Sequence, residues 1–397
     1  MLLKNITMKR EFLDLGKQPI ANGFLYEDDK DTEYFFNLGV AFDEDTKLVT
    51  QTEYVDGELM FNDSYVYRGS MSKTMRDHFH SLSNDLNLIY PGSKILEIGS
   101  NDGVFIKNFN PKTTIAVEPC GNFAKETQEL GYNTYAEFWT QELADKINNE
   151  HGKQDIIFSA NCICHIPDLD QTFKAVESLL SDKGVFIFED PSLAEMVNNN
   201  SYDQVYDEHP HIFSVIALDN LLRRNGLQIT RVENLSVHGG SNRIFAKRIG
   251  SEVDETVEQN KAYERILGLD DYYTFRRFAV KVEQSKDALI RLLTNCKKES
   301  KKIIAYGATS KSTTVFNYCG IGPELIEYIT DTTPEKQGKL SPGMHIPVIT
   351  AKDKIHETVD YAYLGAWNFI SEIKDKEQEF IARGGKFISH VPVVKFV

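Results

Sequence analysis

The spacing of apolar and polar residues changes along the chain, and these changes predict its domain organisation. Residues 1–82 carry short apolar stretches interrupted by acidic clusters. Two stretches, around Tyr34–Phe42 and Leu48–Val55, have the character of hairpin strands with charged turns between them. The segment 70–88 then has the spacing of a helix. We therefore expect a small, irregular, β-containing N-terminal domain over residues 1–82.

After Pro91, apolar stretches alternate with helical ones, which is typical of a parallel, doubly wound sheet. The predicted strands are Lys94–Ile98, Thr114–Val117, Asp155–Ala160 and Val185–Phe188, and the helices between them include Phe123–Leu130 and Leu169–Leu180. Two further strands, Leu227–Leu235 and Asn242–Lys247, follow each other after a short break and predict an antiparallel edge pair. These elements define a central domain over residues 83–250.

The rest of the chain contains a connector and a second α/β unit. Residues 251–295 are charged and have helical periodicity, which predicts a helical connector. An apolar strand within 302–307 then opens a unit that we place at residues 296–397. The expected fold class is thus α/β, with a Rossmann-like central domain, a small N-terminal domain and a second Rossmann-like C-terminal domain.

Composition narrows the classes of partner. The chain has 397 residues and a formal net charge of −15. This charge argues against broad nucleic-acid or anionic-membrane binding, which needs clustered Lys and Arg, but it allows an anionic small molecule in a local pocket. No run of 18 apolar residues exists, and Met1–Asn5 lacks the apolar core of a signal peptide. Five cysteines without a Cys-x-x-Cys pair predict a cytoplasmic protein without structural disulfides.

The clearest local motif is the glycine turn after the first strand of the central domain. Glu97 precedes Gly99 and Gly103 in an E-x-G-x-x-x-G pattern. Gly99 would let a ligand approach the backbone, and Gly103 would allow tight contact between strand and helix. The next strand ends in Glu118, where a carboxylate can accept both hydroxyls of a ribose. Another nucleotide-binding Rossmann unit, or a turn that serves packing only, would also carry glycines here.

This combination resembles the class I S-adenosylmethionine (SAM)-dependent methyltransferases. In that family the glycine turn lies under the methionine part of SAM, and the strand-terminal acid binds its ribose. The resemblance implies that SAM is the cofactor. The residues that it assigns to SAM binding are Glu97, Gly99, Asn101, Gly103, Glu118, Pro119 and Asn161.

A second motif follows the strand at Val185–Phe188. The segment 202–214 packs acids, histidines and tyrosines around Tyr206-Asp207-Glu208-His209. A histidine with a pKa near neutrality can remove a proton, and a neighbouring carboxylate can orient it. An isolated Glu-His pair would equally suit a polar surface loop with a helix cap.

Y-D-E-H followed by an aromatic residue and Ser resembles the sugar C-methyltransferases, the SAM-dependent 3-C-methyltransferases of nucleotide-linked 4-keto-6-deoxy sugars. Further matches to that family are Cys164–Leu169, Val237–Arg243, Tyr306–Thr314, Asn317–Ile321 and Lys336–Pro347. The resemblance covers nearly the whole chain. It implies methylation at C3 of such a sugar through an enolate, with a nucleotide-diphosphate sugar as the partner molecule.

The resemblance also implies residue roles. His209 is the base, Glu208 orients it or contacts the sugar, and Tyr206 and His165 bind or polarise the substrate near its 4-keto group. His165 could alternatively be a hydrogen-bonded histidine at a strand end. Either Tyr65 or Tyr67 would close over the methyl donor.

For the substrate, Lys311 lies in a Thr- and Ser-rich turn between strand and helix, where backbone amides, hydroxyls and an ammonium can hold a pyrophosphate. The alternative is a degenerate Rossmann repeat that only buries the sheet. The expected substrate-binding residues are His238, Ser241, Arg243, Thr309, Ser310, Lys311, Thr313, Asn317 and Lys336.

One departure from the family concerns zinc. The family normally opens with a cysteine-rich zinc-binding domain, whereas residues 1–77 here contain neither Cys nor His. Structural zinc needs about four such ligands, so we predict no metal and an N-terminal domain held by apolar packing.

We expect the protein to be a monomer. A sugar O-methyltransferase, or a non-catalytic protein that binds SAM or a nucleotide sugar, remains an alternative.

Overall fold

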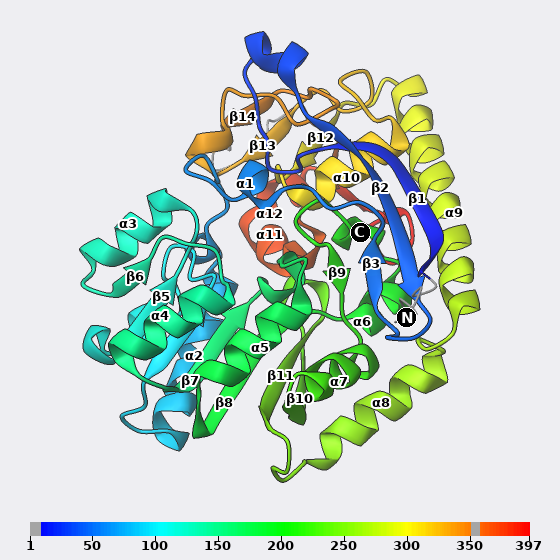
Figure 1. Cartoon of the computed structure of the whole chain (residues 1–397). Helices are drawn as coiled ribbons and strands as arrows, with labels where there is room; N and C mark the ends of the chain where they lie inside the picture. Colours follow the sequence, from blue (N-terminus) through cyan, green and yellow to red (C-terminus); the bar gives the residue numbers. More distant parts are fainter. Residues whose placement is uncertain (1–8, 351–357) are drawn as a thin grey trace.

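The structure, a computed structural model, describes residues 9–350 and 358–397. The expectation about Met1–Asn5 lies outside these residues. Three sheets make up the molecule, one for each predicted α/β or β unit (Figure 1). This arrangement confirms the α/β fold class. No helix in the described part of the chain is long and apolar enough to cross a membrane.

The central sheet has seven strands in the order β10-β11-β8-β7-β4-β5-β6. Its strands are β4 (Ile95–Ile98), β5 (Thr114–Val117), β6 (Asn133–Tyr135), β7 (Gln154–Ala160), β8 (Leu180–Pro191), β10 (Leu227–Leu235) and β11 (Ser241–Arg248). β6, β5, β4, β7 and β8 run parallel, and β11 pairs antiparallel with both β8 and β10. β4 and β5 are buried along their whole length, which explains why their sequences are apolar except for Glu97 and Thr114.

Helices cover the central sheet. They are α2 (Lys73–Ile89), α3 (Gly121–Glu129), α4 (Gln141–His151), α5 (Leu169–Leu179) and α7 (Val215–Arg224). The short helix α6 (Leu193–Asn199) instead buries Leu193, Ala194 and Met196 in the core shared with the N-terminal and C-terminal parts. α2 begins at its N-cap Ser72, whose side chain accepts from the Met75 amide, and it buries Met75, Phe79 and Leu82 among the sheet residues. The boundary that we placed between residues 82 and 83 therefore falls inside α2.

The N-terminal sheet has the order β1-β2-β3-β9. Its strands are β1 (Lys9–Pro19), β2 (Phe35–Asp43), β3 (Val49–Gln51) and β9 (His211–Ile212). β9 belongs to the segment that follows Tyr206–His209, so a strand of the central domain completes the N-terminal sheet. A single-turn helix, α1 (Gly57–Met60), follows β3.

The C-terminal sheet has the order β14-β13-β12-β15-β16-β17 and is parallel except for β17. Its strands are β12 (Ile303–Tyr306), β13 (Ile329–Asp331), β14 (Val348–Thr350), β15 (Tyr361–Leu364), β16 (Lys386–Ser389) and β17 (Lys395–Phe396). Its helices are α10 (Ser310–Cys319), α11 (Ile370–Lys376) and α12 (Gln378–Ala382). The connector consists of α8 (Glu255–Leu267) and the long α9 (Tyr272–Lys298), which runs beside β1 (Figure 1).

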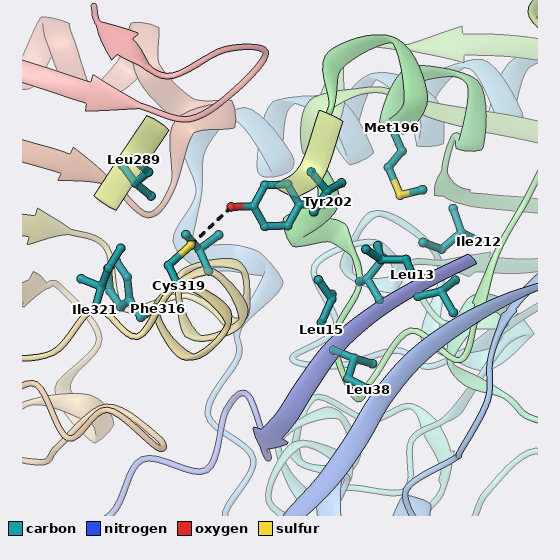
Figure 2. Packing of buried hydrophobic residues seen from close by; sticks show 14 of the residues in the cluster. Leu13, Leu15, Leu38, Met196, Tyr202, Ile212, Leu289, Phe316, Cys319 and Ile321 are labelled. Atoms are coloured by element: carbon teal, nitrogen blue, oxygen red, sulfur yellow. Dashed lines mark hydrogen bonds between the residues drawn. The ribbon is translucent and has the colours of Figure 1, made fainter. Parts of the chain in front are cut away.

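One apolar core joins the three parts. Figure 2 shows Tyr202, fully buried, with its hydroxyl 3.8 Å from the Cys319 sulfur of α10 and with Leu13 and Leu15 of β1 nearby. Leu289 of α9 belongs to the same cluster. The N-terminal domain therefore packs on the other two through buried hydrophobic side chains, which is the mode of stabilisation expected for it.

Candidate active site

A cavity of about 560 Å³ lies where the three parts meet, at the carboxyl ends of β4, β5 and β7. Ligands of doubly wound folds bind at this edge because the loops that follow parallel strands converge there. The predicted site residues that line it are Tyr65, Tyr67, Glu97, Gly99, Asn101, Glu118, Pro119, Asn161, His165, Tyr206, Glu208, His209, His238, Thr309, Ser310, Lys311 and Lys336.

The loops after β4 and β5 form the part of the cavity expected for SAM. Gly99 has φ +74°, and a Cβ there would lie 2.6 Å from the Cys162 sulfur, so only glycine fits this turn. The Glu118 carboxylate accepts hydrogen bonds from the backbone amides of Asn101 at 2.7 Å and Cys120 at 2.9 Å. These two bonds fix both oxygens of Glu118 at the end of β5.

Unpartnered polar atoms in this part of the cavity fit a polar ligand such as SAM. Glu97 Oε2 and Ser100 Oγ are buried and have no hydrogen-bond partner among the described residues. Buried polar atoms without partners are costly, so a ligand that bonds to them would be favoured. Burial also raises the pKa of Glu97 well above its ordinary value, with Glu118 and Asp102 adding to the effect.

The segment after α1 covers the same part of the cavity. The Tyr65 hydroxyl donates to Glu208 Oε2 at 2.8 Å, and Asn101 Nδ2 donates to the Tyr67 carbonyl at 2.9 Å. Phe61 stacks on His165, with ring centroids 5.4 Å apart. Both tyrosines thus lie on the cavity, Tyr65 joined to the Tyr206–His209 motif and Tyr67 to the glycine turn.

His209 has the hydrogen bonds of a neutral base. Its Nδ1 donates to the Gln204 carbonyl at 2.7 Å, which leaves Nε2 as the acceptor for the Tyr206 hydroxyl at 2.6 Å. Burial lowers the pKa of His209 well below 6.5, and the neighbouring His165 and Lys311 lower it further. Burial likewise raises the pKa of Tyr206 well above 10, so its phenol remains a proton donor.

The same cluster also contains a set of metal-ligand types, Cys164, His165 and His209, whose ligand atoms lie within 4.8 Å of one another. The rings of His165 and His209 are stacked at 29° with centroids 5.1 Å apart. Both ring nitrogens of His209 are already engaged, Nδ1 by the Gln204 carbonyl and Nε2 by the Tyr206 hydroxyl, so a metal ion here would have to displace one of these bonds. Burial lowers the pKa of His165 to about 3, and its Nε2 has no partner among the described residues.

The C-terminal unit contributes two lysines, Lys311 and Lys336, to the lining of the same cavity. Lys336 Nζ donates to the Ala308 carbonyl at 2.7 Å and lies 4.8 Å from the centre of the Phe24 ring. Lys311 is in the first turn of α10, next to its N-cap Thr309. The cavity also carries six carboxylates in its described lining: Asp56, Glu58, Glu97, Glu118, Asp168 and Glu208. A single chamber thus offers acidic groups to a cationic ligand and lysines to an anionic one.

Five predicted residues do not line the cavity, and we no longer assign them to a ligand. The four from the substrate set have other partners. Arg243 is paired with Glu189 and Glu233 at 2.6 and 2.7 Å. Thr313 Oγ1 donates to the Ala21 carbonyl, Ser241 Oγ to the Val237 carbonyl and Asn317 Nδ2 to the Thr313 and Pro342 carbonyls.

The fifth, Gly103, serves packing. A Cβ there would lie 3.0 Å from Thr127 of α3, at a positive φ of +75°. This close approach is the tight contact that we expected from Gly103, without contact to the cavity.

Sequence reasoning missed several residues of the site. Asn22 lines the cavity, and its Nδ2 donates to Glu208 Oε1 at 2.6 Å. Gln204 binds His209 through its carbonyl, and Phe61 covers His165. Asn22 lies 186 residues before Glu208 in the sequence, so no local pattern could have indicated this contact.

Family comparisons match all three parts of the chain. Residues 236–392 match the C-methyltransferase C-terminal domain, and residues 67–232 match a methyltransferase domain. Residues 6–61 match a zinc binding domain, although this segment contains neither Cys nor His. The chain is therefore similar to that domain in sequence without its usual ligand types.

One sequence relative matches nearly the whole chain. The C-methyltransferase NovU of Streptomyces niveus is 31% identical over 391 residues, which cover 96% of this chain and 93% of NovU. Among solved structures, a SAM-dependent methyltransferase from Clostridium acetobutylicum is 15% identical with a TM-score of 0.35, covering 46% of this chain and 94% of its own. The carbon methyltransferase of CurJ is 17% identical with a TM-score of 0.34, covering 45% and 56%. With NovU matched over nearly its whole length, the chain belongs to the family of SAM-dependent C-methyltransferases.

Proposed function

We propose that this C-methyltransferase methylates C3 of a nucleotide-linked 4-keto-6-deoxy sugar through an enolate, with His209 as the general base. The observation that carries the proposal is the pair formed by His209 and Tyr206. His209 lines the cavity, and Nε2 of its neutral imidazole lies 2.6 Å from the hydroxyl of Tyr206, a phenol that can donate a proton to an oxygen. Removal of a proton next to a ketone needs this combination of base and donor.

In this mechanism the ketone oxygen of the substrate replaces Nε2 as the acceptor of the Tyr206 hydroxyl. His209 Nε2 is then free to take the proton from C3. The C3–H electron pair moves into the new C3–C4 double bond, and the ketone π electrons move to the oxygen, which Tyr206 stabilises. The carbonyl of Gln204 holds His209 Nδ1–H and stabilises the imidazolium that forms.

Glu208 is the third polar group at this point of the cavity. It accepts from Asn22 Nδ2 and the Tyr65 hydroxyl, which holds its carboxylate in place beside the base. A carboxylate in that position can accept a hydrogen bond from a sugar hydroxyl and so orient the sugar ring. Because it is acceptor-only when ionised, it selects a hydroxyl donor over the ketone oxygen.

SAM, when bound, supplies an electrophilic methyl group. Glu97, Gly99, Asn101 and Glu118 would hold it, since they line the acidic part of the cavity. Phe61, which stacks on His165, and Tyr65, which donates to Glu208, lie beside the base and would help to exclude water from it.

The diphosphate of the substrate would lie against Lys311 and Lys336. Lys311 is at the N-terminal turn of α10, where backbone amides and the helix dipole also favour an anion. No hydrogen bond engages the Lys311 ammonium within the described part of the chain, so it is available to a phosphate.

The test uses SAM carrying a 13C-labelled methyl group and a panel of nucleotide-linked 4-keto-6-deoxy sugars. We expect a product whose labelled carbon has the chemical shift of a methyl group on carbon. A methyl ether would identify an O-methyltransferase and overturn the enolate route. Tight binding of both ligands without turnover of any sugar would overturn the catalytic assignment.

A further inference from the structure

The Tyr206–His209 motif is a tight turn, and one side chain of the N-terminal domain binds both of its ends. The backbone amide of His209 donates to the Tyr206 carbonyl at 2.8 Å, which closes the turn. The amide Nε2 of Gln51 donates to the Tyr206 carbonyl at 2.6 Å and to the His209 carbonyl at 2.9 Å. The amide group of Gln51 thus binds the backbones of Tyr206 and His209, the two residues whose side chains supply the proton donor and the base.

Gln51 is itself held rigidly. It is the last residue of β3, and it is 2% exposed. Its backbone amide donates to the Pro210 carbonyl at 2.8 Å, immediately after the turn. β3 pairs with β9, and Thr50 lies opposite His211 in this pairing. The side chain therefore has a fixed starting point beside the turn.

The N-terminal domain also contacts the two middle residues of the turn. The Ala21 amide donates to Asp207 Oδ1 at 3.1 Å, and Asn22 Nδ2 donates to Glu208 Oε1 at 2.6 Å. All four residues of the turn thus accept a hydrogen bond from this domain, although residues 1–77 contain neither Cys nor His.

We propose that Gln51 is a positioning residue for the reaction. By bridging the carbonyls of Tyr206 and His209, it sets the distance between the phenol and the imidazole, and the N-terminal domain thereby acts as the scaffold of the base. The inference rests on the proposed function, because it assumes that this pair removes the proton. Gln51 does not line the cavity, so it acts through the turn and not on the ligands.

The test is Gln51→Met, which keeps the length of the side chain and removes both donors. The matched control is Gln18→Met. Gln18 is also 2% exposed and lies in the same sheet, and its amide donates to the Leu15 carbonyl, away from the turn. We measure kcat, the Kd for SAM by calorimetry, and deuterium uptake from D2O next to the ketone without SAM.

We expect Gln51→Met to lower kcat and the exchange rate together by about 100-fold, the loss that a misplacement of about 1 Å causes. The Kd for SAM should stay within about twofold, and Gln18→Met should match the wild type in all three. If circular dichroism shows that Gln51→Met does not fold, Gln51→Asn replaces it, since its shorter amide cannot reach both carbonyls.

Two results separate the failure of this inference from that of the proposed function. Wild-type enzyme that exchanges no deuterium overturns the proposed function itself. Wild-type exchange with equal exchange and kcat in the folded Gln51 variant overturns the positioning role alone. A parallel loss of kcat and SAM affinity would indicate a merely structural role and would also overturn it.

Discussion

Lys311 offers a direct test of the proposed binding site for the nucleotide sugar. Lys311→Met removes the ammonium and keeps an unbranched side chain on α10. The ammonium lies on the cavity, where burial lowers the pKa of Lys311 while Asp203 and Glu208 oppose that effect. We expect weaker binding of the proposed nucleotide sugar and unchanged binding of SAM, which we assign to the acidic residues of the cavity.

The magnitude follows from the bonds that the ammonium can make. A hydrogen bond to a charged group contributes about 1.5–3 kcal/mol. Because about 1.4 kcal/mol corresponds to a factor of ten, the loss of one such bond raises the Kd by roughly 10- to 150-fold. Lys336 retains its bond to the Ala308 carbonyl and one ammonium remains in the cavity, so some affinity survives.

The assay is calorimetric titration of the wild type and Lys311→Met with a nucleoside diphosphate and, separately, with SAM. Lys339→Met is the control, because Lys339 lies 5.3 Å from the Tyr26 ring and outside the cavity. A nucleoside diphosphate Kd within about twofold of the wild type would refute the assignment. An equal loss for SAM would show that the lysine supports the whole cavity instead of one ligand.

Three further predictions concern single residues of the site and its surroundings. Glu118→Gln should raise the Kd for SAM by about tenfold or more, because it removes the charge that two backbone amides hold in place and that we assign to the ribose of SAM. An unchanged Kd in calorimetry would contradict this. A lowered pKa means that His209 becomes protonated only at lower pH, so the acid limb of kcat should lie below pH 6.5; a limb at or above 6.5 would contradict the neutral base. Arg243→Met should lower the free energy of unfolding by about 3–5 kcal/mol, since it leaves the buried Glu189 without one partner. It should leave the KM for the sugar unchanged. A higher KM together with unchanged stability in urea unfolding would assign Arg243 to the substrate site again.

The strands of the central sheet and the acidic residue Glu118 could be predicted from sequence, because the patterns that indicate them are local. The apolar residues Ile115–Val117 of β5 directly precede Glu118, and the glycine turn follows β4 directly. β1 escaped prediction because two register shifts interrupt its pairing with β2, and adjacent Phe12 and Leu13 are both buried. Such a strand has no regular alternation to recognise.

The arrangement around the base could not be predicted from sequence, because it depends on distant segments. Gln51 lies 155 residues before Tyr206, and only the pairing of β3 with β9 brings them together. Arg243 shows the opposite problem. Its charge indicated an anion site, whereas the fold places it between Glu189 and Glu233, which neutralise it. Long-range pairing decides whether a charged side chain faces a ligand or another side chain.

The central claim is that His209 removes the proton from the carbon next to the ketone. It is tested most directly by incubating the wild type and His209→Asn with a nucleotide-linked 4-keto-6-deoxy sugar in D2O without SAM, and following the substrate by NMR. Binding of SAM to the variant, measured separately, confirms that it is folded. The account predicts deuterium at C3 with the wild type and none above background with His209→Asn. Equal deuterium uptake by the two proteins would contradict it.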